Sequence, residues 1–276
     1  MLFKIKSKTF LPKEFPLIVG VLNLTPDSFY DGGKYKTRDQ VLRRVEKMVL
    51  EGADIIDIGA ESTRPFSKRI SVSNELKRLL PHLKMIKKNF DIPLSVDTMK
   101  SQVAEASLSE GVEIINDVTG FLFDKNIPKV VGKHDGAIII NHTPSLPEDM
   151  QNNTNYKDIV SDIKAFFKIK IKTCIKSQIN KTSIVLDPGI GFGKNINHNI
   201  DLIKNIKKFK PLGFPLMYGV SNKAFVGEIL KIKNPKKRTN GSVIASYVCI
   251  ENGAQLIRVH NVKETKQMVT MWRELN

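Results

Sequence analysis

Cysteine and long apolar runs are both scarce in this chain, and each scarcity excludes a class of protein. Its 276 residues include two cysteines, Cys174 and Cys249, which lie far apart without CxxC spacing, so neither a disulfide framework nor a zinc site is indicated. No apolar run approaches the roughly 20 residues of a membrane span. Residues 1–23 contain lysines but no long apolar core of a signal peptide. We therefore expect a soluble cytoplasmic protein without a membrane partner.

Positive charge, by contrast, is in excess. The chain has 44 Lys and Arg against 28 Asp and Glu, a net charge of +16, which raises the hypothesis of a basic nucleic-acid-binding protein. The lysines are spread over segments with apolar residues at helical spacing, such as DIKAFFKIKIKTCIK, which is typical of the solvated faces of amphipathic helices. No binding motif accompanies the charge, so we expect no nucleic-acid partner, although anionic small substrates would be attracted.

Short apolar runs alternate with amphipathic helical patterns along the whole chain. The runs predict strands over 16–23, 54–60, 93–97, 113–118, 137–142, 183–187, 215–220 and 255–260. A parallel strand covered on both faces reads as a continuous apolar run, and eight strand–helix units are the composition of a TIM barrel. The predicted fold class is α/β: a single (β/α)8 TIM barrel domain over 1–276. Residues 1–15 are expected to form a short N-terminal hairpin or plug below it.

The helical patterns end at residues that favour helix termination. They predict helices over 37–52, 73–89, 100–110, 125–134, 156–179, 198–209, 223–231, 241–252 and 262–274. Gly52, Gly111 and Gly253 each follow such a pattern just before a strand, at the position where glycine is favoured after a helix.

Polar residues gather where the predicted strands end. The runs end at Asn23, Glu61 to Thr63, Asp97, Asn116 with Asp117, His142, Asp187, Ser221 to Lys223, and Arg258 to His260. A polar residue in a buried strand is costly unless it lies at the strand's end. The carboxyl ends of all barrel strands share one rim, which is therefore the predicted active site.

The rim residues divide into two chemical groups. Asp97, Asn116 and Asp187 suit a flat heterocycle with a guanidine-like edge of N–H donors. The second group supplies positive charge and donors for an anion, and consists of Arg64, Lys223, Arg258 and His260. The amide oxygen of Asn23 is a reasonable magnesium ligand when a substrate phosphate supplies the rest. The sequence thus predicts a ring pocket beside a diphosphate site.

Seven blocks carry a family resemblance. They are GVLNLTPDSFYDGG (20–33), GADIIDIGAESTRP (52–65), LSVDT (94–98), INDVTG (115–120), LDPGIGFGK (186–194), GVSNK (219–223) and GS…GAQLIRVH (241–260). In these blocks, which cover nearly the whole chain in order, the protein resembles the dihydropteroate synthases, folate-pathway enzymes targeted by sulfonamide drugs. NLTPDSF, ESTRP and DPGIGFGK are specific in combination, whereas any one alone would be weak.

The resemblance implies a TIM barrel and a transferase that requires Mg²⁺. Such an enzyme joins 4-aminobenzoate to the methylene carbon of (7,8-dihydropterin-6-yl)methyl diphosphate, releasing diphosphate and 7,8-dihydropteroate. The step looks dissociative, because diphosphate leaves first and positioning rather than a side-chain nucleophile then brings in the aniline nitrogen. Family members are commonly homodimers, so a homodimer is expected.

The resemblance also assigns roles to individual residues. It places Asp97, Asn116, Asp187 and Lys223 on the pterin edge with Arg258 beside the ring, Asn23 at the magnesium, Thr63, Arg64, Arg258 and His260 on the diphosphate, and Phe192 with Lys223 beside the aminobenzoate. The residues expected to act in catalysis are Asp97, Lys223, Arg64 and His260.

Some positions depart from the family pattern, and they bear on aminobenzoate binding. Asn222, Ala224, Asn261 and Phe66 stand where the family has other residues, and Ala224 removes a serine hydroxyl expected to meet the aminobenzoate carboxylate. Such a change would weaken binding without abolishing the reaction. A catalytically weak pterin-binding homologue therefore stays an alternative. Methyltetrahydrofolate–corrinoid methyltransferases share the barrel, but NLTPDSF and ESTRP argue against them.

Other residues receive blander interpretations. GIGFGK (189–194) lacks the spacing of a nucleotide-binding loop, so its glycines are explained by close backbone packing beside Asp187. His142 reads at least as well as a structural histidine as a catalytic one. Asp57 belongs to the second strand and is assigned no chemistry.

Overall fold

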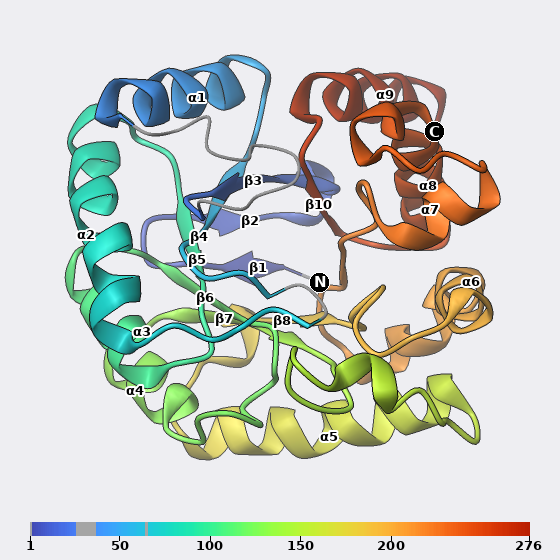
Figure 1. Cartoon of the computed structure of the whole chain (residues 1–276), viewed down its shortest axis with the longest axis horizontal. Helices are drawn as coiled ribbons and strands as arrows, with labels where there is room; N and C mark the ends of the chain where they lie inside the picture. Colours follow the sequence, from blue (N-terminus) through green and yellow to red (C-terminus); the bar gives the residue numbers. More distant parts are fainter. Residues whose placement is uncertain (1, 26–36, 64–65) are drawn as a thin grey trace.

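In the computed structural model, which describes residues 2–25, 37–63 and 66–276, parallel strands form a barrel with helices outside it (Figure 1). The strands are β3 (Leu17–Asn23), β4 (Ile55–Gly59), β5 (Leu94–Asp97), β6 (Ile114–Asp117), β7 (Ala137–Asn141), β8 (Ile184–Asp187), β9 (Met217–Tyr218) and β10 (Leu256–Val259). They pair in the order β8-β7-β6-β5-β4-β3-β10-β9. A parallel bridge between Leu186 and Leu216 brings β8 against the chain leading into β9, so the barrel is nearly closed. The predicted (β/α)8 fold is confirmed.

The helices surround the barrel in chain order (Figure 1). They are α1 (Arg38–Leu50), α2 (Val72–Asn89), α3 (Ser101–Ser109), α4 (Ile127–Lys133), α5 (Ile159–Lys176), α6 (Ile196–Lys204), α7 (Ala224–Ile229), α8 (Thr239–Glu251) and α9 (Val262–Leu275). Short 3-10 helices lie at η1 (Pro12–Glu14), η2 (Met150–Asn152), η3 (Lys181–Ser183), η4 (Ile206–Leu212) and η5 (Pro235–Lys237). Gly52, Gly111 and Gly253 have φ of 91°, 86° and 105°, the left-handed conformation expected after a helix. No helix of the described residues is long and apolar enough to cross a membrane.

The strand predicted over 215–220 is shorter in the structure, and its flanking residues explain why. Pro215 has no N–H to donate. The N–H of Leu216 donates to the side-chain Oε1 of Gln255 at 2.8 Å, so it is not used in the ladder. Regular pairing is left to Met217 and Tyr218.

The lower barrel interior is apolar and closed by the N-terminal hairpin. Strands β1 (Phe3–Lys4) and β2 (Thr9–Phe10) pair antiparallel, and the rings of Phe3 and Phe10 stack with centroids 5.9 Å apart. These rings pack in one cluster with Ile5, Leu17, Val19, Ile55, Ile114, Ala137, Ile139, Val185, Met217 and Leu256. The plug expected from residues 1–15 is therefore present, and it seals the end of the barrel opposite the strands' carboxyl ends.

A polar layer lies directly above this apolar one. Successive side chains of a strand alternate between faces, so the residue two positions after an inward-pointing residue also points inward. The pairs are Ile55 and Asp57 in β4, Ser95 and Asp97 in β5, Ile114 and Asn116 in β6, Val185 and Asp187 in β8, and Leu256 and Arg258 in β10. Strand order and alternation together thus bring the predicted ring-binding residues to one level of the barrel.

Candidate active site

The centre of the polar layer is an ion cluster around Arg258. Its Nε donates to Oδ2 of Asp57 at 2.6 Å, and its Nη2 donates to Oδ2 of Asp97 at 3.0 Å. The Asn116 amide also donates to Oδ2 of Asp57, at 3.1 Å. One guanidinium therefore bridges two carboxylates that are almost completely buried. Asp57 was assigned no chemistry from the sequence, although alternation from Ile55 places it inside the barrel.

Burial determines the charge behaviour of this cluster. It raises the pKa of Asp97 to about 8, with the Arg258 guanidinium lowering that pKa and the Asp57 carboxylate raising it. Burial lowers the pKa of Arg258, but the Asp57 and Asp97 carboxylates raise it by more, so the pKa lies above its usual value. The site thus holds a permanent cation beside a carboxyl group that can gain or lose a proton near neutral pH.

Asp187 lies on the opposite side of the barrel interior, at the end of β8. Its Oδ1 accepts the N–H of Gly189 at 2.8 Å. Burial raises its pKa to about 6, against that backbone hydrogen bond and the charges of Lys223 and Arg258. Asp187 and Arg258 therefore interact electrostatically within one polar layer.

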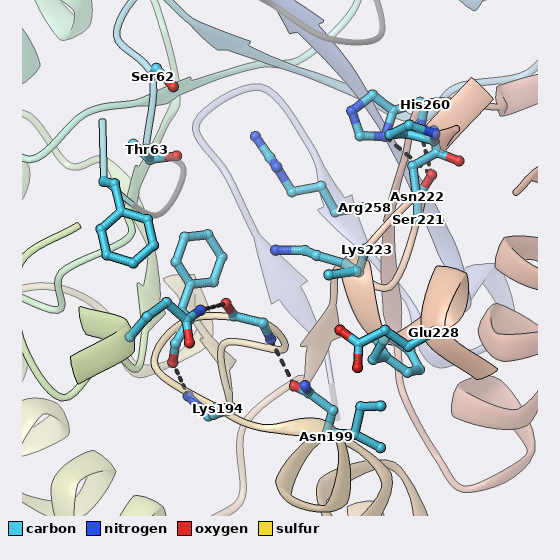
Figure 2. A pocket seen from close by; sticks show the side chains of 18 of the residues that line it. Ser62, Thr63, Lys194, Asn199, Ser221, Asn222, Lys223, Glu228, Arg258 and His260 are labelled. Atoms are coloured by element: carbon cyan, nitrogen blue, oxygen red, sulfur yellow. Dashed lines mark hydrogen bonds between the residues drawn. The ribbon is translucent and has the colours of Figure 1, made fainter. Parts of the chain in front are cut away.

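A cavity of about 890 Å³ opens above the polar layer (Figure 2). Seven of the ten predicted site residues line it, namely Asn23, Thr63, Asp97, Phe192, Lys223, Arg258 and His260. Asn116 and Asp187 are buried and are not among its lining residues. The tenth, Arg64, lies outside the described residues. Described members of both predicted groups, ring-binding and anion-binding, thus meet at a single cavity.

One wall of the cavity joins Phe192 to Lys223. The Nζ of Lys223 lies 4.0 Å from the centroid of the Phe192 ring, a cation–π contact. In Figure 2 the side chains of Lys223 and Arg258 point in the same direction, toward the wall that carries Thr63. Gly191, with φ of 80°, packs against the Lys223 stem, where an added Cβ would lie 3.2 Å from Cδ.

His260 and Ser221 bring the ends of β10 and β9 together at the rim. The Ser221 hydroxyl oxygen lies 3.1 Å from Nδ1 of His260 and accepts its backbone N–H at 3.2 Å. The His260 carbonyl in turn accepts from Nη2 of Arg44 in α1 at 2.9 Å. These contacts hold His260 at the cavity edge, beside the cationic side chains (Figure 2).

A second buried ion cluster was not anticipated from the sequence. The ammonium of Lys100, which precedes α3, contacts Glu61 at 2.7 Å and Glu75 of α2 at 2.6 Å. The other oxygen of Glu61 accepts the N–H of Ile70 at 2.6 Å. Glu61 follows β4 and lines the cavity, so this cluster fixes the start of the segment that carries Thr63.

The chemistry of the cavity residues fits a magnesium ion that takes its other ligands from water and substrate phosphate. Asn23, at the end of β3, lines the cavity and offers a neutral amide oxygen. Among the described residues no group of three or more His, Cys, Asp or Glu could hold a metal ion. A single neutral oxygen fits Mg²⁺, which commonly keeps waters and takes its other ligands from substrate phosphates.

Three of the four positions that depart from the expected pattern, Phe66, Asn222 and Ala224, line the same cavity. Phe66 lines it with φ of 64°, and 66% of its surface is exposed. Asn222 has φ of 59° and donates its N–H to the Ser242 hydroxyl at 2.9 Å. Ala224, the first residue of α7, also lines the cavity but offers no side-chain hydrogen bond there.

Fold and site together define a TIM-barrel enzyme with a polar ring pocket and a cationic rim, and comparison with known proteins agrees. A family model described as pterin binding enzyme matches residues 19–260. The curated dihydropteroate synthase of Clostridium beijerinckii is 38% identical over 269 residues, 97% of each chain.

Solved structures extend the likeness to three dimensions. The Yersinia pestis dihydropteroate synthase with a sulfonamide drug complex superposes with a TM-score of 0.94 at 37% identity, covering 100% of this chain and 98% of that one. The Thermus thermophilus enzyme in complex with 4-aminobenzoate gives 0.88 at 35% identity, covering 100% of both. This chain therefore belongs to the dihydropteroate synthase family of pterin-binding enzymes.

Proposed function

We propose that this protein condenses (7,8-dihydropterin-6-yl)methyl diphosphate with 4-aminobenzoate, giving 7,8-dihydropteroate and diphosphate. The observation that carries the proposal is one cavity with a carboxylate–amide layer at its base and cationic side chains at its rim. The base matches the donor-rich edge of a pterin, and the rim matches its diphosphate. The Thermus thermophilus relative in complex with 4-aminobenzoate supports the choice of second substrate.

The pterin is proposed to bind in the polar layer. Its guanidine-like edge of N–H donors would meet Asp97, Asn116 and Asp187, whose buried oxygens need such partners. Oδ1 of Asp97 and Oδ1 of Asn116 are buried without a hydrogen-bond partner among the described atoms. A heterocycle that supplies donors to these oxygens is selected over one that leaves them unpaired.

The diphosphate is proposed to leave from the rim. Thr63, His260 and Arg258 line that part of the cavity, and Arg64 is assigned there by the family resemblance. Asn23 would be the protein ligand of Mg²⁺, which when bound supplies positive charge to the departing oxygens. Positive side chains at the rim stabilise the same developing charge without moving, because they are already in place.

Bond breaking is proposed to precede attack. Once the bond to diphosphate breaks, the positive charge on the methylene carbon is delocalised into the pterin ring, and an ionised Asp97 beside that ring favours it. The aniline nitrogen of 4-aminobenzoate then attacks the methylene carbon from the side of Phe192 and Lys223, and the resulting ammonium passes its proton to water. Its attack depends on position rather than on a side-chain base.

The second candidate function is that of a homologue with a weaker site for 4-aminobenzoate, and Ala224 is the observation that favours it. The first residue of α7 lines the cavity without a hydroxyl, so a carboxylate there would rely on backbone N–H groups. A homologue that binds pterin and couples aminobenzoate poorly would retain the whole polar layer. The two candidates differ only in the acceptor step.

One experiment separates them. Purified protein is mixed with the pterin diphosphate, Mg²⁺ and 4-aminobenzoate, and dihydropteroate is measured by mass spectrometry with a parallel sample containing a chelator. We expect product in the first sample and a large loss in the second. Pterin binding by calorimetry without any product would support the weak homologue, and binding of neither substrate would refute both readings.

We also propose a homodimer in the cytoplasm. Ile244, 64% exposed, and its helical neighbours Tyr247 and Val248 form an apolar strip on the surface of α8. Cys174 and Cys249 are both free and buried, which suits a reducing compartment. Sedimentation velocity tests the assembly: Ile244→Lys should yield monomers, and an unchanged dimer would exclude this face.

A further inference from the structure

The loop between β8 and α6 is held by side chains bound to its backbone. Gly189, Gly191 and Gly193 have φ of 75°, 80° and 60°, so the loop has a high conformational freedom that must be overcome when it is ordered. Side chains from three other segments and from the loop itself supply the ordering contacts. They are Gln151 Nε2 to Gly191 O at 2.8 Å, Lys194 Nζ to Phe192 O at 2.8 Å, Tyr156 OH to Gly193 O at 3.0 Å, and Gly191 N to Asn199 Oδ1 at 2.7 Å.

Lys194 is the unusual member of this set. It is 4% exposed, and besides the Phe192 carbonyl its Nζ contacts Nδ1 of His142 at 3.1 Å and the His142 carbonyl at 3.3 Å. All three acceptors are uncharged when Nδ1 accepts, and burial lowers the pKa of His142 well below its usual range, which keeps its ring neutral. Three acceptors match the three donors of an ammonium group.

This environment is costly for a lysine. Burial lowers the pKa of Lys194 well below its usual range, against the attraction of Asp187. An apolar side chain of similar length would avoid that desolvation cost, but it would leave the carbonyl oxygens of Phe192 and His142 without this donor. The Lys194 amine links the loop after β8 to the end of β7, because it donates hydrogen bonds to the carbonyl oxygens of both Phe192 and His142.

We propose that Lys194 is a positioning residue for the second substrate, acting through Phe192. By holding the Phe192 carbonyl, Lys194 fixes the main chain from which the Phe192 ring reaches Lys223, 4.0 Å away. That ring and ammonium form the wall proposed to border 4-aminobenzoate. The inference rests on the proposed function and adds a residue that does not itself touch the substrate in that scheme.

The contacts predict a selective effect. The hydrogen bonds among Asp97, Asn116 and Arg258 in the polar layer do not involve Lys194, which acts on that layer through the attraction between its ammonium and the Asp187 carboxylate. Removing the Lys194 amine should therefore loosen the acceptor wall while the pterin pocket keeps its geometry. Loss of overall fold would instead weaken both substrates together.

The test measures the two substrates separately. Lys194→Met should raise the KM for 4-aminobenzoate by roughly tenfold, because the lost contact to the Phe192 carbonyl is worth about 1 kcal/mol or more and binding must then order that wall, with pterin affinity by calorimetry within about twofold. Lys194→Gln, which can still donate to the Phe192 carbonyl, should lie between Met and wild type. Lys172→Met, the same change at an exposed position of α5, is the control and should match wild type.

Each outcome supports or refutes the inference. An unchanged aminobenzoate KM in Lys194→Met, or an equal loss for both substrates, would overturn it while leaving the proposed function intact. If Lys194→Met does not fold, Tyr156→Phe removes the neighbouring contact to Gly193 O and must show the same split. A wild-type protein without product would instead defeat the proposed function, and this inference with it.

Discussion

Asp57 offers the most informative perturbation of the site, because it controls both Arg258 and Asp97. In Asp57→Asn the amide oxygen can still accept from Nε of Arg258, so the change removes charge more than shape. The hydrogen bond it replaces is 2.6 Å long, and a bond to a charged group contributes about 1.5–3 kcal/mol. Arg258 keeps Asp97 as a partner, so we expect the free energy of unfolding near pH 7 to fall by no more than that amount.

The sharper signature is in the pH profile. Burial raises the pKa of Asp97 to about 8 and the Asp57 carboxylate adds to it, whereas Arg258 opposes it. Ionised Asp97 favours the proposed cation, so kcat/KM of the wild type should rise with pH as this group loses its proton. Without the Asp57 charge the pKa of Asp97 falls, and the rise should move at least about one pH unit lower.

Ionisation of Asp97 should also affect the free energy of unfolding, which falls over the pH range in which kcat/KM rises. A carboxyl whose folded pKa lies above its unfolded value of 3.8 costs stability as pH rises from that value toward 8. The variant, with a lower folded pKa for Asp97, should lose less over this range. The assays are initial-rate pH profiles and denaturant unfolding, with Asp91→Asn as an exposed control. Superimposable rate profiles for Asp57→Asn and wild type would refute the coupling.

Three further variants test other parts of the site. Asp97→Asn should slow turnover by an order of magnitude or more with the fold retained, because an ionised group beside the cation is lost; near-normal kcat would remove its assigned role. Ala224→Ser should tighten 4-aminobenzoate by about 1.5–3 kcal/mol, and an unchanged KM would show that residue 224 does not reach the carboxylate. Lys100→Met leaves Glu61 and Glu75 buried without their cation and should cost about 3–5 kcal/mol. Burial raises the pKa of Glu75 and the Lys100 ammonium opposes that rise, so without the ammonium the loss of stability should shrink as pH falls. A pH-independent loss in denaturant unfolding would contradict the ion-cluster account.

The features that could be predicted from the sequence are those that depend on the residue pattern of a single strand. Asp97, Asn116 and Asp187 stand at the ends of apolar runs, and alternation with their inward neighbours brings them to one layer. Asp57 obeys the same rule but lies two residues before its strand ends, so the run alone did not mark it as functional.

Other contacts could not be read from the sequence. Lys100, Glu61 and Glu75 meet because α2, α3 and β4 pack together, and charges so far apart in the chain carry no local signal. Lys194 lies in the quoted DPGIGFGK block, yet its acceptors are mostly main-chain carbonyls, which every residue has. The glycines of that block were explained correctly by close packing: a Cβ on Gly189 would lie 2.0 Å from the His142 carbonyl oxygen.

The N-terminal hairpin has a kinetic consequence. Because Phe3 and Phe10 fill the far end of the barrel, a molecule bound in the layer of Asp57 and Asp97 enters and leaves at the carboxyl ends of the strands, as far as the described residues define the barrel. Under the proposed function the pterin diphosphate must bind before 4-aminobenzoate, because bound 4-aminobenzoate would block access to the polar layer. Dihydropteroate must leave past Phe192 before the next substrate can bind. We therefore expect product release to limit turnover.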